Sequence, residues 1–128
     1  MANRSVQIIK DNENAQNDTF LFFLHEKNQF SENAFWELYD AIDSIQKEGI
    51  QDESIIILIS RVYQEILKEV VYHFDPQDLS AIEDFPSDYR GYIERLDYVI
   101  QELYSGRTDA IDDSIFELPY REGEQHYR

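Results

Sequence analysis

The most apolar stretch of the chain runs from Ser54 to Phe74, and its hydrophobic residues follow helical spacing. One stripe recurs at steps of three or four residues, and a second stripe follows the same rhythm one position later: Ile55, Ile59, Val62, Ile66 and Val70, and then Ile56, Tyr63, Leu67 and Val71. Two adjacent stripes form an apolar surface too wide to pack on a single neighbour. We therefore expect residues 53–74 to form the central helix of a bundle.

Two other long helices are predicted, over about 31–48 and 87–105, because apolar residues recur in both at helical spacing. Short apolar segments at 20–27, 76–85 and 108–119 predict two or three short helices. Typical caps and breakers mark the ends of the long helices: Ser31, Gly49, Asp52, Pro76, Ser87 and Gly106. The expected fold is all-α, a single-domain helical bundle.

The 128 residues are expected to form one domain around one core, since 42% of them are hydrophobic. Residues 1–18 are expected to form a polar N-terminal arm, whose segment 5–10 could instead pair as a short strand. Residues 120–128 are expected to be a frayed C-terminal tail. Near the N-terminus we find neither a signal peptide nor an apolar run long enough to span a membrane, so a cytoplasmic protein is expected.

Charge narrows the functional classes further. The chain has 27 Asp and Glu against 11 Lys and Arg, a formal net charge of −16, and no cysteine. The electric field of so many negative charges repels nucleic acid and anionic membranes and attracts cationic partners. Neither nucleic acid nor a membrane is therefore an expected partner. The absence of cysteine leaves no basis for a disulfide framework or a thiolate metal site.

No motif in the sequence predicts catalysis, a cofactor or a metal ion. The three histidines, His25, His73 and His126, lie on separate segments without the spacing of a helical zinc site. Phosphate-binding glycine loops and the nucleophile elbow of hydrolases are absent. The many carboxylates are better explained as solvated helix faces than as acid–base pairs. The chain is therefore not expected to be an enzyme.

An acidic face with aromatic residues is predicted on the 31–48 helix, opposite its apolar stripe. Trp36 falls there with Asp40 and Asp43, and Tyr39 lies at the boundary. The 87–105 helix repeats the pattern with Glu94, Tyr98 and Glu102. Two interpretations stay open for Trp36: the segment 20–24 folds back and covers it, or it anchors a basic partner.

A small, cysteine-free, strongly acidic helical chain with such a face resembles the bacterial immunity proteins of contact-dependent and other polymorphic toxin systems. The stretches FFLHEKNQFSENAFWELYDAIDSI and SIIILISRVYQEILKEVVYHF resemble their all-α members in pattern and composition. The resemblance implies tight binding to one cognate toxin, often a basic nuclease and more often a ribonuclease than a deoxyribonuclease. It assigns no binding residue by position.

Three hypotheses follow. The chain is an immunity protein that covers the substrate-binding site of a basic toxin, a helical adaptor for another cationic protein, or an enzyme that uses its abundant carboxylates. The first is favoured, with Trp36, Tyr39, Asp40, Asp43, Glu94, Tyr98 and Glu102 as partner-binding residues. A monomer is expected, and a dimer would follow if residues 20–24 were not covered within the chain.

Overall fold

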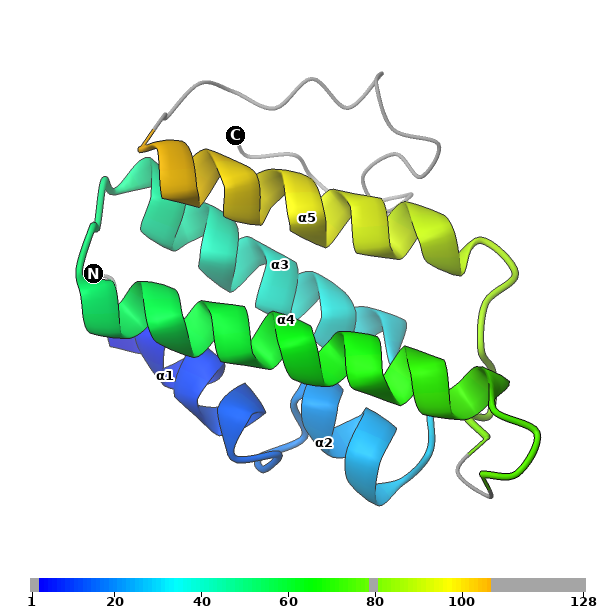
Figure 1. Ribbon diagram of the computed structural model, residues 1–128. Coiled ribbons are helices and arrows are strands. Elements are labelled where there is room, and N and C mark those ends of the chain that lie inside the picture. The colour runs from blue at the N-terminus through cyan, green and yellow to red at the C-terminus, as the bar shows by residue number, and fades with distance from the viewer. Residues whose placement is uncertain (1–2, 79–80, 107–128) are drawn as a thin grey trace.

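The computed structural model describes residues 3–78 and 81–106, which form an all-α bundle (Figure 1). Five helices are present in this part of the chain, and the three long ones confirm the predicted fold class. Their bounds are α1 (Asn3–Glu13), α2 (Phe20–Glu26), α3 (Glu32–Lys47), α4 (Glu53–Phe74) and α5 (Tyr89–Ser105).

The helices occupy four corners around one core (Figure 1). Helices α1 and α2 lie end to end and together fill one corner. Each of α3 and α4 packs against α1, α2 and α5, so α3 and α4 face each other diagonally across the bundle. The aromatic centre of the core includes Phe20 from α2, Phe35 from α3 and Tyr92 from α5, whose rings meet edge to face.

Local signals explain where the long helices begin and end. The Ser31 hydroxyl accepts a hydrogen bond from the Ala34 amide, and the Asp52 carboxylate accepts one from the Ser54 amide. Gly49 and Gly106 have φ angles of +72° and +75°, a region that favours glycine. The expected cap at Ser87 is wrong, because α5 begins at Tyr89 and Asp88 occupies the N-cap position.

The predicted N-terminal arm is also wrong, because residues 3–13 form α1, which packs against α3 and α4. Ile9 and Asn12 are fully buried, and Val6 and Ile8 pack partly against the core. The segment is polar on average, but its few apolar residues share one helical face, and that face is enough to dock the helix.

A buried asparagine joins α1 to α2. The Asn12 side chain donates to the Ile8 carbonyl at 2.9 Å and accepts from the Leu21 amide at 3.1 Å. Leu21 lies in the first turn of α2, where amide groups lack helical partners. Thr19, the N-cap residue, makes no side-chain cap bond. Asn12 therefore supplies from a neighbouring helix the acceptor that α2 lacks locally.

The connection between α4 and α5 differs from the short helix expected at 76–85. Its described residues form turns, and Glu83 pairs with Gln29 in an isolated bridge. The His73 ring holds this connection against α4, because its Nδ1 atom accepts from the Ile82 amide at 2.8 Å. The short helix predicted at 108–119 and the tail predicted at 120–128 lie outside the described residues.

The helix that is most deeply buried is α3 rather than α4, which corrects the expected centre of the bundle. Ten of the 16 residues of α3 are buried, against four of the 22 residues of α4. The buried residues of α4 are Ile59, Val62, Ile66 and Glu69, which belong to a single face. The first apolar stripe supplies three of these residues, whereas Ile56 and Tyr63 of the second stripe are half-buried and pack partly against the core.

Candidate protein-binding surface

The predicted anchor residues Trp36 and Tyr39 lie in the interior, and both are 0% exposed. The Trp36 ring packs against Tyr92 of α5, with 6.4 Å between ring centroids. The Arg95 guanidinium, also on α5, lies 5.7 Å from the Trp36 ring and 5.3 Å from the Tyr39 ring. The structure therefore contradicts the anchor interpretation of Trp36 and the boundary position of Tyr39: Trp36 is covered within the chain, with Tyr92 and Arg95 of α5 against its ring.

Arg95 is itself fully buried, a feature that the helical pattern did not reveal. Its Nη1 atom donates to the Tyr39 hydroxyl at 2.8 Å. Two other polar groups of the same cluster, Trp36 Nε1 and the Tyr92 hydroxyl, donate hydrogen bonds to the Glu32 carboxylate. Polar side chains between α3 and α5 thus pair with each other, so that both helices bury faces that look hydrophilic in sequence.

Two predicted acidic binding residues, Asp43 and Glu102, are also buried, at 5% and 3% exposure. Asp43 forms an ion pair with Lys47 one turn later on α3, with 3.2 Å between Oδ2 and Nζ. Charged residues are rarely buried unless they are paired, so sequence pattern alone favours placing them on the surface. Neither residue is available to a partner in this structure.

The remaining predicted residues do reach the surface. Glu94 is exposed, and Asp40 and Tyr98 are half-buried. Asp40 lines a shallow groove between α1 and α3, close to the ion pair that Arg4 and Glu37 form at 3.6 Å. The structure therefore does not gather the seven predicted residues into one surface patch.

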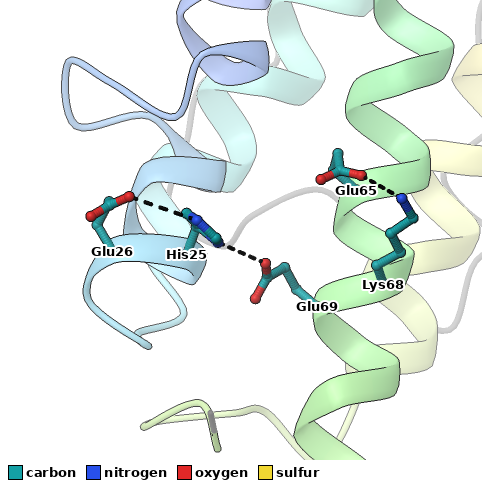
Figure 2. A network of polar contacts seen from close by, with 5 residues as sticks. All are labelled: His25, Glu26, Glu65, Lys68 and Glu69. Carbon is teal, nitrogen blue, oxygen red and sulfur yellow. Dashed lines mark hydrogen bonds and ion pairs between the residues drawn. The ribbon is translucent and has the colours of Figure 1, made fainter.

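A second polar cluster links α2 to α4 (Figure 2). His25 Nδ1 lies 3.1 Å from a Glu69 carboxylate oxygen, and His25 Nε2 lies 3.8 Å from Glu26. Glu65 lies one turn before Glu69 on α4 and forms an ion pair with Lys68, at 3.0 Å. Because Glu69 is 8% exposed, its bond to His25 offsets the cost of burying a carboxylate and holds α2 on α4.

Carboxylates from three helices border an open pocket of about 300 Å³ beside this cluster, lined by Glu13, Asn14, Ala15, Leu21, His25, Glu26, Glu65 and Glu69. Within residues 3–78 and 81–106, no three His, Asp or Glu side chains are placed so that they could hold a metal ion. The geometry of this pocket fits a structural contact between helices.

The largest exposed apolar side chains of the described residues lie mainly on α4. Val71 is 64% exposed, Phe74 54%, Ile57 44% and Tyr72 42%, and Tyr104 of α5 is 46% exposed. The Tyr104 hydroxyl is hydrogen-bonded to Ser60, which places it over the first half of α4, whereas Val71 and Phe74 lie at the other end of this helix. None of these residues was among the predicted partner-binding residues, and only Val71 belongs to the second apolar stripe that the spacing of α4 shows.

None of the described helices combines the length and the apolar character needed to cross a bilayer. Comparison with models of known protein families, with curated proteins and with solved structures gave no match. The features of the chain that bear on function are its charge and its exposed apolar residues.

Proposed function

We propose that this chain is an immunity protein that binds a cognate basic toxin and blocks its substrate-binding surface. The observation that carries the proposal is the excess of negative charge, 27 acidic against 11 basic residues, on a small helical domain. Much of this excess lies at the surface: among the described residues, fourteen exposed Asp and Glu accompany seven exposed Lys and Arg.

The chemistry of a nuclease suits such an inhibitor. A nuclease binds phosphates with Lys and Arg side chains, and a protein rich in carboxylates offers those cations an alternative anion. Opposite fields also accelerate encounter, and close charge pairs at such interfaces couple by ~1.5–7 kcal/mol. A ribonuclease is the favoured target, and Asp40 and Glu94 are the predicted carboxylates that reach the surface.

The proposal includes a cytoplasmic location, where a toxin that attacks nucleic acid would act. It also includes a monomeric state, because a net charge of −16 on each copy opposes self-association. The apolar segment of α2 supports the monomer, since Phe20, Leu21 and Leu24 are buried within the chain.

Co-expression with the protein encoded immediately upstream tests the proposal, followed by pull-down and by nuclease assays on RNA and on DNA. We expect a stoichiometric complex in which nuclease activity is lost. A variant with Asp40→Lys and Glu94→Lys should bind more weakly and keep its helical circular dichroism spectrum. If the upstream protein is an active nuclease that neither binds this chain nor loses activity in its presence, the immunity proposal fails.

The alternative is a helical adaptor that binds another cationic protein without inhibiting it. The same net charge supports this alternative, and the assay separates the two functions. A stable complex whose partner keeps full activity would favour the adaptor over the inhibitor.

A further inference from the structure

The second apolar stripe of α4 runs from a half-buried part, packed partly against the core, to an exposed end near the C-terminus of the helix. We call it the outer stripe, and it consists of Ile56, Tyr63, Leu67, Val71 and Phe74. The first three are half-buried, whereas Val71 and Phe74 are 64% and 54% exposed. The stripe is therefore anchored at one end and open to water at the other.

The spacing of the outer stripe is that of a helix-packing seam. Its members follow one another at steps of seven, four, four and three residues, and Ser60 divides the first step into four and three. In the described part of the chain, α4 packs on α1, α2 and α5. A row of apolar side chains at this spacing is typical of a surface that packs against an apolar ridge, such as one side of a helix.

The charges beside the outer stripe differ between its two sides. On the α5 side, Asp97 and Glu94 are exposed, and the Asp97 charge acts on the Tyr63 hydroxyl. Arg90 is exposed nearer the start of α5. On the opposite side, α4 exposes Arg61 and Lys68, and Lys68 is paired with Glu65. A partner would therefore meet carboxylates over the middle of α5, the Arg90 guanidinium at its start, and the Arg61 and Lys68 side chains along α4.

We infer that the outer stripe of α4, together with Tyr104, is the docking surface for the cationic protein partner. The inference rests on the proposed function and specifies where and how the partner binds. The partner presents an apolar ridge to Val71 and Phe74, and its Lys or Arg side chains lie over Asp97 and Glu94. Exposed apolar groups rimmed by polar residues commonly mark protein interfaces.

Charge argues for a cationic partner rather than a second copy of the chain. Each copy carries a net charge of −16, so two copies repel each other, whereas a basic protein is attracted from a distance. Apolar burial then supplies short-range affinity after the encounter, which is the usual division between the two effects.

Affinity for the upstream-encoded protein, measured by isothermal titration calorimetry, tests the docking surface. Val71→Asp should weaken binding at least tenfold, because it puts a carboxylate against the apolar ridge. The same change makes the chain more acidic, so weaker long-range attraction cannot cause the loss. Val71→Ile should keep the affinity, because it preserves an apolar side chain.

Gln16→Glu is the matched control, since it adds the same charge at an exposed position in the connection between α1 and α2. It should leave the affinity within about twofold of the unaltered chain, and both acidic variants should keep the helical spectrum. If Val71→Asp binds as tightly as Gln16→Glu, the docking surface is wrong while the proposed function stands.

Two further outcomes would overturn the inference in different ways. No complex with the unaltered chain would remove the proposed function, and the docking surface with it. Sedimentation equilibrium should show a monomer; a dimer that Val71→Asp dissociates would assign the outer stripe to a second copy. Within the complex, Asp97→Lys should weaken binding more than Arg61→Glu, and the reverse order would contradict the orientation of the partner.

Discussion

Helices α3 and α4 lie at opposite corners of the same bundle (Figure 1) but differ in how much of their surface is buried. Helix α4 carries the two apolar stripes, yet it buries one face and exposes Val71 and Phe74. Helix α3 has acidic and aromatic residues around most of its circumference, yet it buries Trp36, Tyr39 and Asp43. The more apolar helix is therefore the more exposed of the two.

The difference teaches that burial depends on neighbours as much as on hydrophobicity. Polar groups on α3 find partners at short range: Tyr39 accepts from Arg95, and Asp43 pairs with Lys47. Once paired, such groups can be buried at modest cost. The outer stripe of α4 is only partly covered by the described residues: Phe74 packs against Phe85 and Tyr89, but Val71 remains 64% exposed and available to a partner.

The strongest test of this contrast is truncation of the large side chain on each helix. Trp36→Ala should lower the free energy of unfolding by about 3–5 kcal/mol, because it leaves a cavity beside Tyr92 and Arg95. Val71→Ala, at an exposed site on α4, should change it by less than about 0.5 kcal/mol. Urea unfolding followed by circular dichroism measures both, and similar losses in the two variants would contradict the contrast.

A smaller effect is expected from removing single hydroxyl groups. Tyr39→Phe should cost about 1–3 kcal/mol of stability, because a buried Arg95 donor loses its acceptor. Tyr72→Phe on α4 is the matched change at a side chain that is 42% exposed, and it should be nearly neutral. Thermal unfolding of the two variants under the same conditions checks the comparison, and equal shifts would place Tyr39 outside the core.

The smallest effect concerns the outer stripe at alkaline pH. Burial, aided by the nearby Asp97 and Tyr104, raises the pKa of Tyr63 to about 12. The pKa of tyrosine in an unfolded chain is about 10. Between about pH 10 and pH 12 the Tyr63 hydroxyl therefore loses its proton in the unfolded state but keeps it in the folded state. Tyr63 should therefore stabilise the fold fully below about pH 10 and lose this contribution as the pH rises to about 12.

The expected loss is about 1 kcal/mol, less than the full shift implies, because water screens this half-buried side chain. Tyr63→Phe should lack this loss, so the stability difference between the two chains should shrink or change sign across that pH range. A difference that stays constant from pH 9 to pH 12 would show that Tyr63 is more exposed than the structure indicates.

Much of the fold could be predicted from sequence because its signals are local. Helical spacing and caps such as Ser31 and Asp52 are set by residues within one or two turns. Helix α1 was missed because its docking depends on one buried face, centred on Ile9, and on contacts with α3 and α4 that lie far along the chain. Average polarity conceals such a face.

The candidate surface was predicted less well, for a related reason. A helical wheel shows which residues share a face, but it does not show which face meets another helix. Trp36 was placed opposite the apolar stripe of α3, and the wheel gave no sign that Tyr92 and Arg95 of α5 would pack there. The outer stripe of α4 was visible in the sequence and was assigned to the core because it is apolar.

The fluorescence of Trp36 tests the interior position of the α3 face most directly, since it is the only tryptophan in the chain. Emission should be blue-shifted, and acrylamide, a neutral quencher that the negative charge does not repel, should quench it several-fold less than it quenches free tryptophan amide. Red-shifted emission with quenching equal to that of the free amide would contradict the account and return Trp36 to the surface as a binding residue.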